Sequence, residues 1–225
     1  MARDDQTTPH PPATPEFAPV QVGGPVHEYP SRAGVTVRKL AVGPYDNNVY
    51  VVASGGQAIV VDGAAEPDRI LAEVSGLQVV AIVQTHGHVD HVQALPTLVR
   101  ALDPAVLAHP ADPWPVPIEP IADGDAVGVG DVSVRALHTP GHTPGSVCFL
   151  LETPGGPAHL FSGDTLFPAG PGNTRGNPDD FTTIMCSLDR LFELPDGTRV
   201  SPGHGLDTTL GRERPYVPVW RARGW

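Results

Sequence analysis

Glycine and proline restrict the folds open to this chain more than any other feature of its sequence. They account for 25 and 27 of its 225 residues, close to a quarter of the total. Proline interrupts helices and central strands, and glycine weakens both, so this chain must be rich in turns or partly disordered. A helical bundle and a coiled coil are therefore excluded, and the length suits one domain or at most two small ones.

The charge of the chain excludes one broad class of partner. The formal net charge is −11, and Lys39 is the only lysine beside 13 arginines. Binding of nucleic acid needs basic surface that displaces counterions, so we expect no nucleic-acid partner. No apolar run approaches the length of a membrane span, and no apolar signal segment opens the chain, so we expect no membrane contact and a cytoplasmic location.

The prolines divide the chain into two parts. Residues 1–32 contain seven prolines and few large apolar residues, which predicts a disordered or loosely attached extension. Residues 33–225 carry the apolar patterns of one folded domain. Strands are predicted over residues 35–42, 48–53, 57–62, 79–83, 105–108, 125–129, 132–138, 146–152, 158–162 and 198–201, with helices beginning at Pro67, Pro96 and Pro178. Two runs of strands, each followed by a helix, predict a layered α/β sandwich.

The strongest functional signal is the segment His-Gly-His-Val-Asp-His at residues 86–91, directly after the apolar run 79–83. On extended backbone His86 and His88 point to the same side, and the glycine between them allows a tight turn. Three imidazoles and a carboxylate within six residues suit zinc, iron or manganese. The segment therefore predicts a metal site at the end of a buried strand.

Three further side chains share this character, because His142, Asp164 and His204 each lie next to a glycine at a predicted strand end. A single histidine or aspartate in a turn is commonly structural. Beside the first cluster, however, these three become predicted ligands. No ligand role is assigned to the other histidines, of which His138 is expected to have a supporting or structural role near the His142 turn: His10, His27, His109, His138 and His159.

Together these motifs resemble the metallo-β-lactamase-fold hydrolases. The resemblance extends over residues 35–210 and rests on Thr-His-x-His-x-Asp-His at 85–91, Thr-Pro-Gly-His-Thr-Pro-Gly at 139–145, Gly-Asp-Thr at 163–165 and Pro-Gly-His-Gly at 202–205. It implies a four-layer αβ/βα sandwich that holds two divalent ions, zinc before iron or manganese. It also implies the ligands: His86, His88 and His142 for the first ion, Asp90, His91 and His204 for the second, and Asp164 as the bridge.

Within this family the chain is most similar to the glyoxalase II-like group, which hydrolyses thioesters such as S-hydroxyacylglutathione. Gly-Asp-Thr-Leu-Phe at 163–167 and the segment from His204 to Glu213 carry this similarity. Glutathione itself is not implied, because the group binds it with basic residues of a C-terminal extension, and the residues after His204 contain no lysine. The best-known β-lactamases carry cysteine in place of Asp164, which argues against antibiotic hydrolysis.

The resemblance implies a hydrolase that attacks a thioester or related ester of a small molecule through a metal-bridging hydroxide. Asp90 is the predicted catalytic residue, which orients the nucleophile or shuttles the proton. The loops at 110–120 and 168–176 are the predicted walls of the substrate site, with Asn173 and Arg175 as polar anchors.

Two alternatives keep the same fold. A mononuclear-iron persulfide dioxygenase, an oxidoreductase, would use only His86, His142 and Asp164 and leave iron positions open for oxygen. Lactone hydrolysis is a further option within the hydrolase class. The presence of Asp90, His91 and His204 favours the dinuclear hydrolase.

Overall fold

Two β-sheets face each other in the computed structural model, which describes residues 20–30 and 33–224. The first sheet contains, in order, β1 (His27–Glu28), β2 (Val35–Val42), β3 (Asn47–Ser54), β4 (Gln57–Val61), β5 (Gln78–Val83), β6 (Ala105–Ala108) and β7 (Glu119–Pro120). The second contains β15 (Thr208–Thr209), β14 (Arg199–Pro202), β11 (His159–Gly163), β10 (Val147–Leu151), β9 (Val132–His138) and β8 (Ala126–Val129). A short ribbon pairs β12 (Leu166–Phe167) with β13 (Gly170–Pro171).

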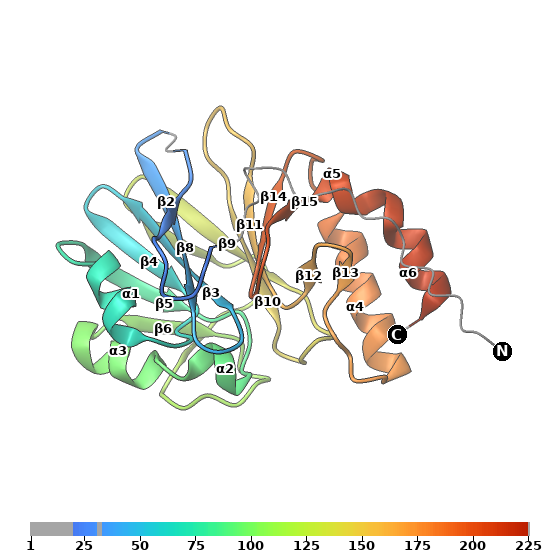
Figure 1. The fold of residues 1–225 in the computed structure, drawn as a ribbon, viewed down its shortest axis with the longest axis horizontal. Coiled ribbons are helices and arrows are strands. Elements are labelled where there is room, and N and C mark those ends of the chain that lie inside the picture. Colours follow the sequence, from blue (N-terminus) through green and yellow to red (C-terminus); the bar gives the residue numbers. More distant parts are fainter. Residues whose placement is uncertain (1–19, 31–32, 225) are drawn as a thin grey trace.

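Helices cover the outer face of each sheet (Figure 1). The first sheet is covered by α1 (Pro67–Glu73), α2 (Val89–Val92) and α3 (Leu95–Leu102). The second is covered by α4 (Pro178–Leu191), α5 (Leu210–Glu213), the 3₁₀ helix η2 (Arg214–Tyr216) and α6 (Val217–Arg223). The predicted four-layer αβ/βα sandwich is therefore confirmed.

Three apolar cores hold these layers together. Phe149 and Phe161 belong to the core between the sheets, Leu95 and Leu98 to the core under α3, and Met185 to the core under α4. Strand β5 serves two of them, since successive side chains of a strand point to opposite faces. Val83 enters the core between the sheets and Ile82 the core under the helices, as the continuous apolar run predicted.

Parallel strands bring the functional loops to one edge. Strands β4, β5 and β6 are parallel neighbours in the first sheet, and β11 and β14 are parallel neighbours in the second. The carboxyl ends of parallel neighbours lie at the same edge of a sheet. The loops that follow these strands carry Asp62, residues 86–91, Asp112, Asp164 and His204.

Residues 20–30 differ from the prediction of a loosely attached extension over 1–32. Strand β1 pairs with β2, and Tyr29 is buried, its hydroxyl donating to Asp207 Oδ2 at 2.6 Å. These contacts join the segment to the domain despite its proline-rich composition. Residues 1–19 and 31–32, the rest of that prediction, lie outside the described residues.

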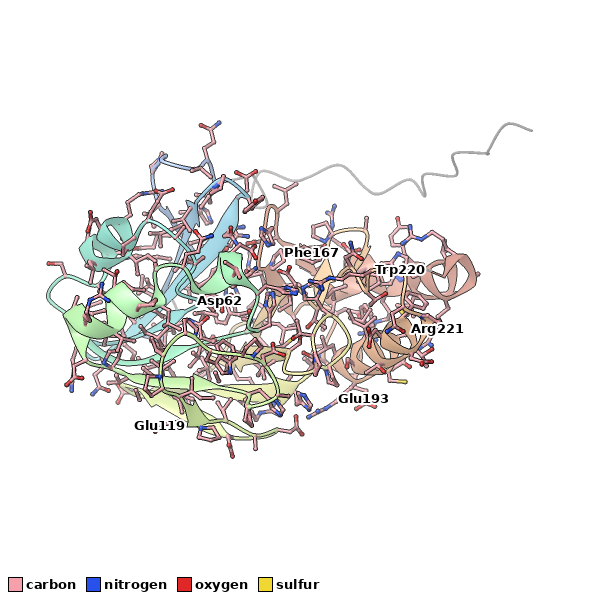
Figure 2. All side chains as sticks on the ribbon, turned by 90° about the horizontal axis from the view of Figure 1, so that it is seen from below. Asp62, Glu119, Phe167, Glu193, Trp220 and Arg221 are labelled. Carbon is pink, nitrogen blue, oxygen red and sulfur yellow. The ribbon has the colours of Figure 1, made fainter. Side chains whose placement is uncertain are left out.

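The C-terminal helices were not predicted either. Trp220 of α6 is 1% exposed and packs into the core under the second sheet (Figure 2). Helix α6 has only seven residues, too few for a clear helical period. No helix among the described residues is long and apolar enough to cross a membrane. The predicted cytoplasmic location stays a prediction.

Candidate metal centre

All seven predicted ligand side chains meet at the edge where the loops converge. Their nitrogen and oxygen atoms form three overlapping groups, each with its atoms within 4.8 Å of one another. The groups are His86, His88 and His142; His86, His91 and Asp164; and Asp90, His91 and His204. Loops from both sheets contribute, so the site depends on how the two halves of the sandwich pack.

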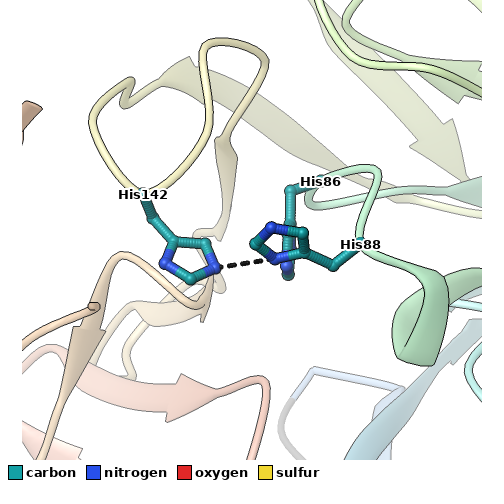
Figure 3. A group of neighbouring side chains, drawn as sticks. All are labelled: His86, His88 and His142. Atoms are coloured by element: carbon teal, nitrogen blue, oxygen red, sulfur yellow. Dashed lines mark hydrogen bonds between the residues drawn. The ribbon is translucent and has the colours of Figure 1, made fainter. Parts of the chain in front are cut away.

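The first group joins the loop after β5 to the turn before β10. His88 Nδ1 lies 3.0 Å from His142 Nε2, and Figure 3 shows both rings beside that of His86. His142 is oriented by its Nδ1, which donates to the carbonyl oxygen of Asn173 at 2.9 Å. Its Nε2 therefore points to the centre of the group.

The group of Asp90, His91 and His204, called the second group from here on because it matches the predicted second ion, joins α2 to the loop after β14. His204 Nε2 lies 3.1 Å from His91 Nε2 and 3.4 Å from Asp90 Oδ2. His204 Nδ1 donates to the carbonyl oxygen of Tyr45 at 2.7 Å, while Asn47 Nδ2 donates to Asp90 Oδ2 at 2.9 Å. These outer hydrogen bonds fix the directions in which the imidazole and the carboxylate face the centre.

Asp164 lies between the two groups. Its Oδ2 is 3.4 Å from His142 Nε2 and 3.5 Å from His204 Nε2, and its Oδ1 is 3.5 Å from His91 Nε2. Ligands at about 2.1 Å from a tetrahedral ion lie roughly 3.4 Å apart, which matches this spacing.

Two buried atoms of the site have no hydrogen-bond partner within residues 20–30 and 33–224: His86 Nε2 and Asp164 Oδ1. Buried polar atoms are nearly always paired. An unpaired imidazole nitrogen and an unpaired carboxylate oxygen beside five other donors fit divalent metal ions. The metal ligand set itself stays a proposal.

Electrostatics favour a cation at this place. Burial lowers the pKa of His91, but the hydrogen bond with Asp62 and the charge of Asp164 outweigh it and raise this pKa to about 9. For Asp164, burial raises the pKa, yet the hydrogen bond with His204 and the charge of His91 hold it well below its usual range. Burial holds the pKa of His86 well below its usual value, so this imidazole is neutral and can offer a lone pair.

Asp62 supports the site and was missed as a functional residue. It follows β4, is buried, and its Oδ2 lies 3.0 Å from His91 Nδ1. Its two oxygens also accept from the Thr85 backbone N–H at 2.7 Å and the Thr85 hydroxyl at 2.8 Å. The carboxylate thus fixes the ring of His91 and the start of the histidine segment. The position of Asp62 at a strand end beside β5 was the signal that could have identified it.

An Asp62→Asn variant is expected to bind zinc about 10–100-fold more weakly, the usual cost of losing such an outer partner. In an asparagine only the side-chain oxygen accepts, so it cannot accept all the hydrogen bonds that the two Asp62 oxygens accept from His91 and Thr85. Competition with a chromophoric chelator measures the affinity. Asp68→Asn, which changes an exposed carboxylate of α1, is the control and should leave the affinity unchanged. Equal affinities in the two variants would refute a supporting role for Asp62.

Two cavities flank the centre. One of about 500 Å³ is lined by residues that include His88, His142 and Arg175, and the other, of about 380 Å³, by Tyr45, Val89, Asp90, Gln93 and His204. Both loops predicted as walls, 110–120 and 168–176, contribute to the larger cavity.

The predicted polar anchors lie on the wall of the larger cavity or next to it. Arg175 Nη2 is 3.0 Å from His88 Nε2, and Asn173 Oδ1 accepts from the Arg175 backbone N–H at 2.6 Å. His138 lies outside the ligand groups: its Nε2 donates to the carbonyl oxygen of Pro144 at 3.0 Å and its ring stacks on His109.

Known proteins are similar to this chain in sequence and in fold. The family model of the metallo-beta-lactamase superfamily matches residues 42–113 and 110–204. Over 162 residues the chain is 40% identical to the hydroxyacylglutathione hydrolase of Anaeromyxobacter dehalogenans, covering 71% of this chain and 61% of that protein. The solved structure of TTHA1623 in a di-iron-bound form is 37% identical with a TM-score of 0.67, covering 78% of this chain and 96% of that one. The structure of ETHE1 from Myxococcus xanthus is 30% identical with a TM-score of 0.69, covering 81% and 83%.

Proposed function

Because this chain belongs to the metallo-β-lactamase superfamily, we propose that it is a dinuclear metal-dependent hydrolase of a thioester or related ester. The observation that carries the proposal is the place of Asp164. Its carboxylate reaches His142 of one group and both His91 and His204 of the other. A carboxylate placed between two groups of ligands suits a two-ion centre.

Bound metal ions and the side chain of Asp90 would have separate roles in the reaction. When bound, divalent ions would supply an activated water and a Lewis acid for the carbonyl oxygen of the substrate. Asp90 is half-buried and lines the smaller cavity, and Asn47 Nδ2 donates to its Oδ2. This carboxylate can accept the proton of the attacking water and orient its lone pair.

The cavities support a small-molecule substrate that lies across the centre. Both volumes fall within the range of roughly 300–1,000 Å³ that is usual for such ligands. The guanidinium of Arg175 on the larger side favours a substrate part that carries negative charge. The exposed Tyr45 and Val89 on the smaller side favour an apolar part.

The mononuclear-iron dioxygenase remains the second candidate. His142 Nε2 and His86 Nε2 lie 3.4 and 4.0 Å from Asp164 Oδ2, so these three side chains could hold one iron without the second group. The similarity to ETHE1 also supports this candidate. The close approach of Asp90, His91 and His204 favours the hydrolase, because these three side chains would hold no metal in the one-iron enzyme.

Metal analysis combined with activity separates the two candidates. We expect two zinc, iron or manganese ions per chain and thioester hydrolysis without uptake of oxygen. The His91→Asn variant should keep one ion and lose most of the hydrolysis, whereas His109→Asn, outside the ligand groups, should keep both. A single iron per chain with thiol-dependent oxygen uptake would overturn the hydrolase in favour of the dioxygenase.

A further inference from the structure

Asp112 has a carboxylate buried beside the metal centre without belonging to it. It lies in the loop after β6, is 7% exposed, and is absent from all three groups of candidate ligands. The sequence assigned this loop only to the wall of the substrate site. A carboxylate loses much of its solvation free energy on burial, so the hydrogen bonds to Asp112 must offset that cost.

Both oxygens of Asp112 accept hydrogen bonds, and the donors come from two different loops. Oδ2 accepts from the Gly87 backbone N–H at 2.8 Å and from the Thr143 hydroxyl at 2.7 Å. Oδ1 accepts from the Gly145 backbone N–H at 2.9 Å. Gly87 separates His86 from His88, while Thr143 and Gly145 follow His142. One carboxylate therefore joins the two segments that carry the first group of ligands.

The glycines of both segments are needed for this approach. A Cβ atom on Gly87 would lie 2.8 Å from Asp112 Cβ, and one on Gly145 would lie 2.7 Å from Asp112 Cγ. Real Cβ atoms do not approach so closely, so any side chain there would push the carboxylate away. Each loop is thus shaped to accept Asp112 beside a predicted ligand.

We propose that Asp112 is a positioning residue that sets the separation between the His86–His88 segment and His142. This inference rests on the proposed function, because it takes these histidines as ligands of the first ion. The second group, Asp90, His91 and His204, makes none of the three hydrogen bonds to Asp112. Asp112 therefore controls the affinity of the first ion and leaves that of the second unchanged.

The test measures zinc affinity at each position separately. A His204→Asn background keeps the first group intact, and a His88→Asn background keeps the second. Asp112→Asn is added to each, and zinc is titrated against a chromophoric chelator into protein previously stripped of metal. We expect an affinity loss of about 10–100-fold in the His204→Asn background and less than about twofold in the His88→Asn background.

Two further variants keep the test independent of folding. Thr143→Val has nearly the same shape but removes one of the three donors, so it should weaken the first site in the same direction and by less. Asp125→Asn changes an exposed loop carboxylate that accepts from the Ala122 backbone N–H, and should change neither affinity. Thermal unfolding of the stripped proteins reports any loss of stability.

Each outcome decides between the explanations. Equal losses of affinity in both backgrounds, or a fall in stability with unchanged affinities, would make Asp112 a merely structural residue and overturn the inference. If neither background variant nor the unsubstituted protein binds zinc, the proposed function fails together with this inference. Zinc binding in both backgrounds with no effect of Asp112→Asn overturns this inference alone.

Discussion

An Asp164→Asn variant is expected to lose at least one metal ion per chain and most of its hydrolytic activity. The carboxylate lies within 3.5 Å of His142 in the first ligand group and of His91 and His204 in the second. An amide is neutral, and its nitrogen donates hydrogen bonds and offers no lone pair to a metal ion. The asparagine side chain therefore cannot replace both carboxylate oxygens between the two groups. We expect the rate to fall by about 10²–10³-fold or more, the scale for losing one preorganised electrostatic group.

Metal analysis and thioester turnover of the purified variant check this expectation. Asp131→Asn is the matched control, since Asp131 is an exposed carboxylate in the turn between β8 and β9. It should keep both ions and full activity. Circular dichroism should show the same fold in both variants, because Asp164 belongs to none of the three apolar cores. Full metal content and full activity in Asp164→Asn would show that the ligand assignment is wrong.

The strands and the residues of the site were predictable because their signals are local. Strands β2, β6 and β9 have the predicted bounds, 35–42, 105–108 and 132–138. Four of the seven predicted ligands lie within residues 86–91, and each of the others follows or precedes a strand next to a glycine. An apolar run bounded by turn residues predicts a strand from a few neighbouring positions, so the prediction does not depend on contacts with distant residues.

The supports of the site could not be predicted in this way. Asp62 acts on Thr85 from 23 residues away, and Asp112 acts on Gly145 from 33 residues away. Nothing in the local sequence marks Asp112 as different from an aspartate in an ordinary turn, and the one signal at Asp62 is its place at the end of a predicted strand. The same holds for residues 20–30, whose prolines indicated disorder although Tyr29 bonds Asp207, 178 positions along the chain. Such roles arise only when the folded sheets bring distant loops together.

A Lys39→Met variant is expected to destabilise the fold by about 3–5 kcal/mol, the usual cost of breaking a buried ion pair. Lys39, the only lysine, and Asp207 are almost fully buried, with Nζ 2.8 Å from Asp207 Oδ1. The methionine fills the same space but removes the closest cation, and the carboxylate keeps the Tyr29 hydroxyl and the guanidinium of Arg199, whose Nη1 lies 3.8 Å away. Urea denaturation measures the loss as a change in the free energy of unfolding.

The same variant should also weaken the second metal position, because Lys39 Nζ donates to the Gly205 carbonyl oxygen at 2.7 Å, directly after His204. Adding Asp207→Asn should cost less than the sum of the two single changes, since the buried carboxylate that lost its closest cation is then neutral. Arg38→Gln is the control: it breaks partly exposed contacts with Glu28 and Glu73 and should cost about 1 kcal/mol or less per pair. Additive costs for Lys39→Met and Asp207→Asn would show that the two charges do not stabilise each other.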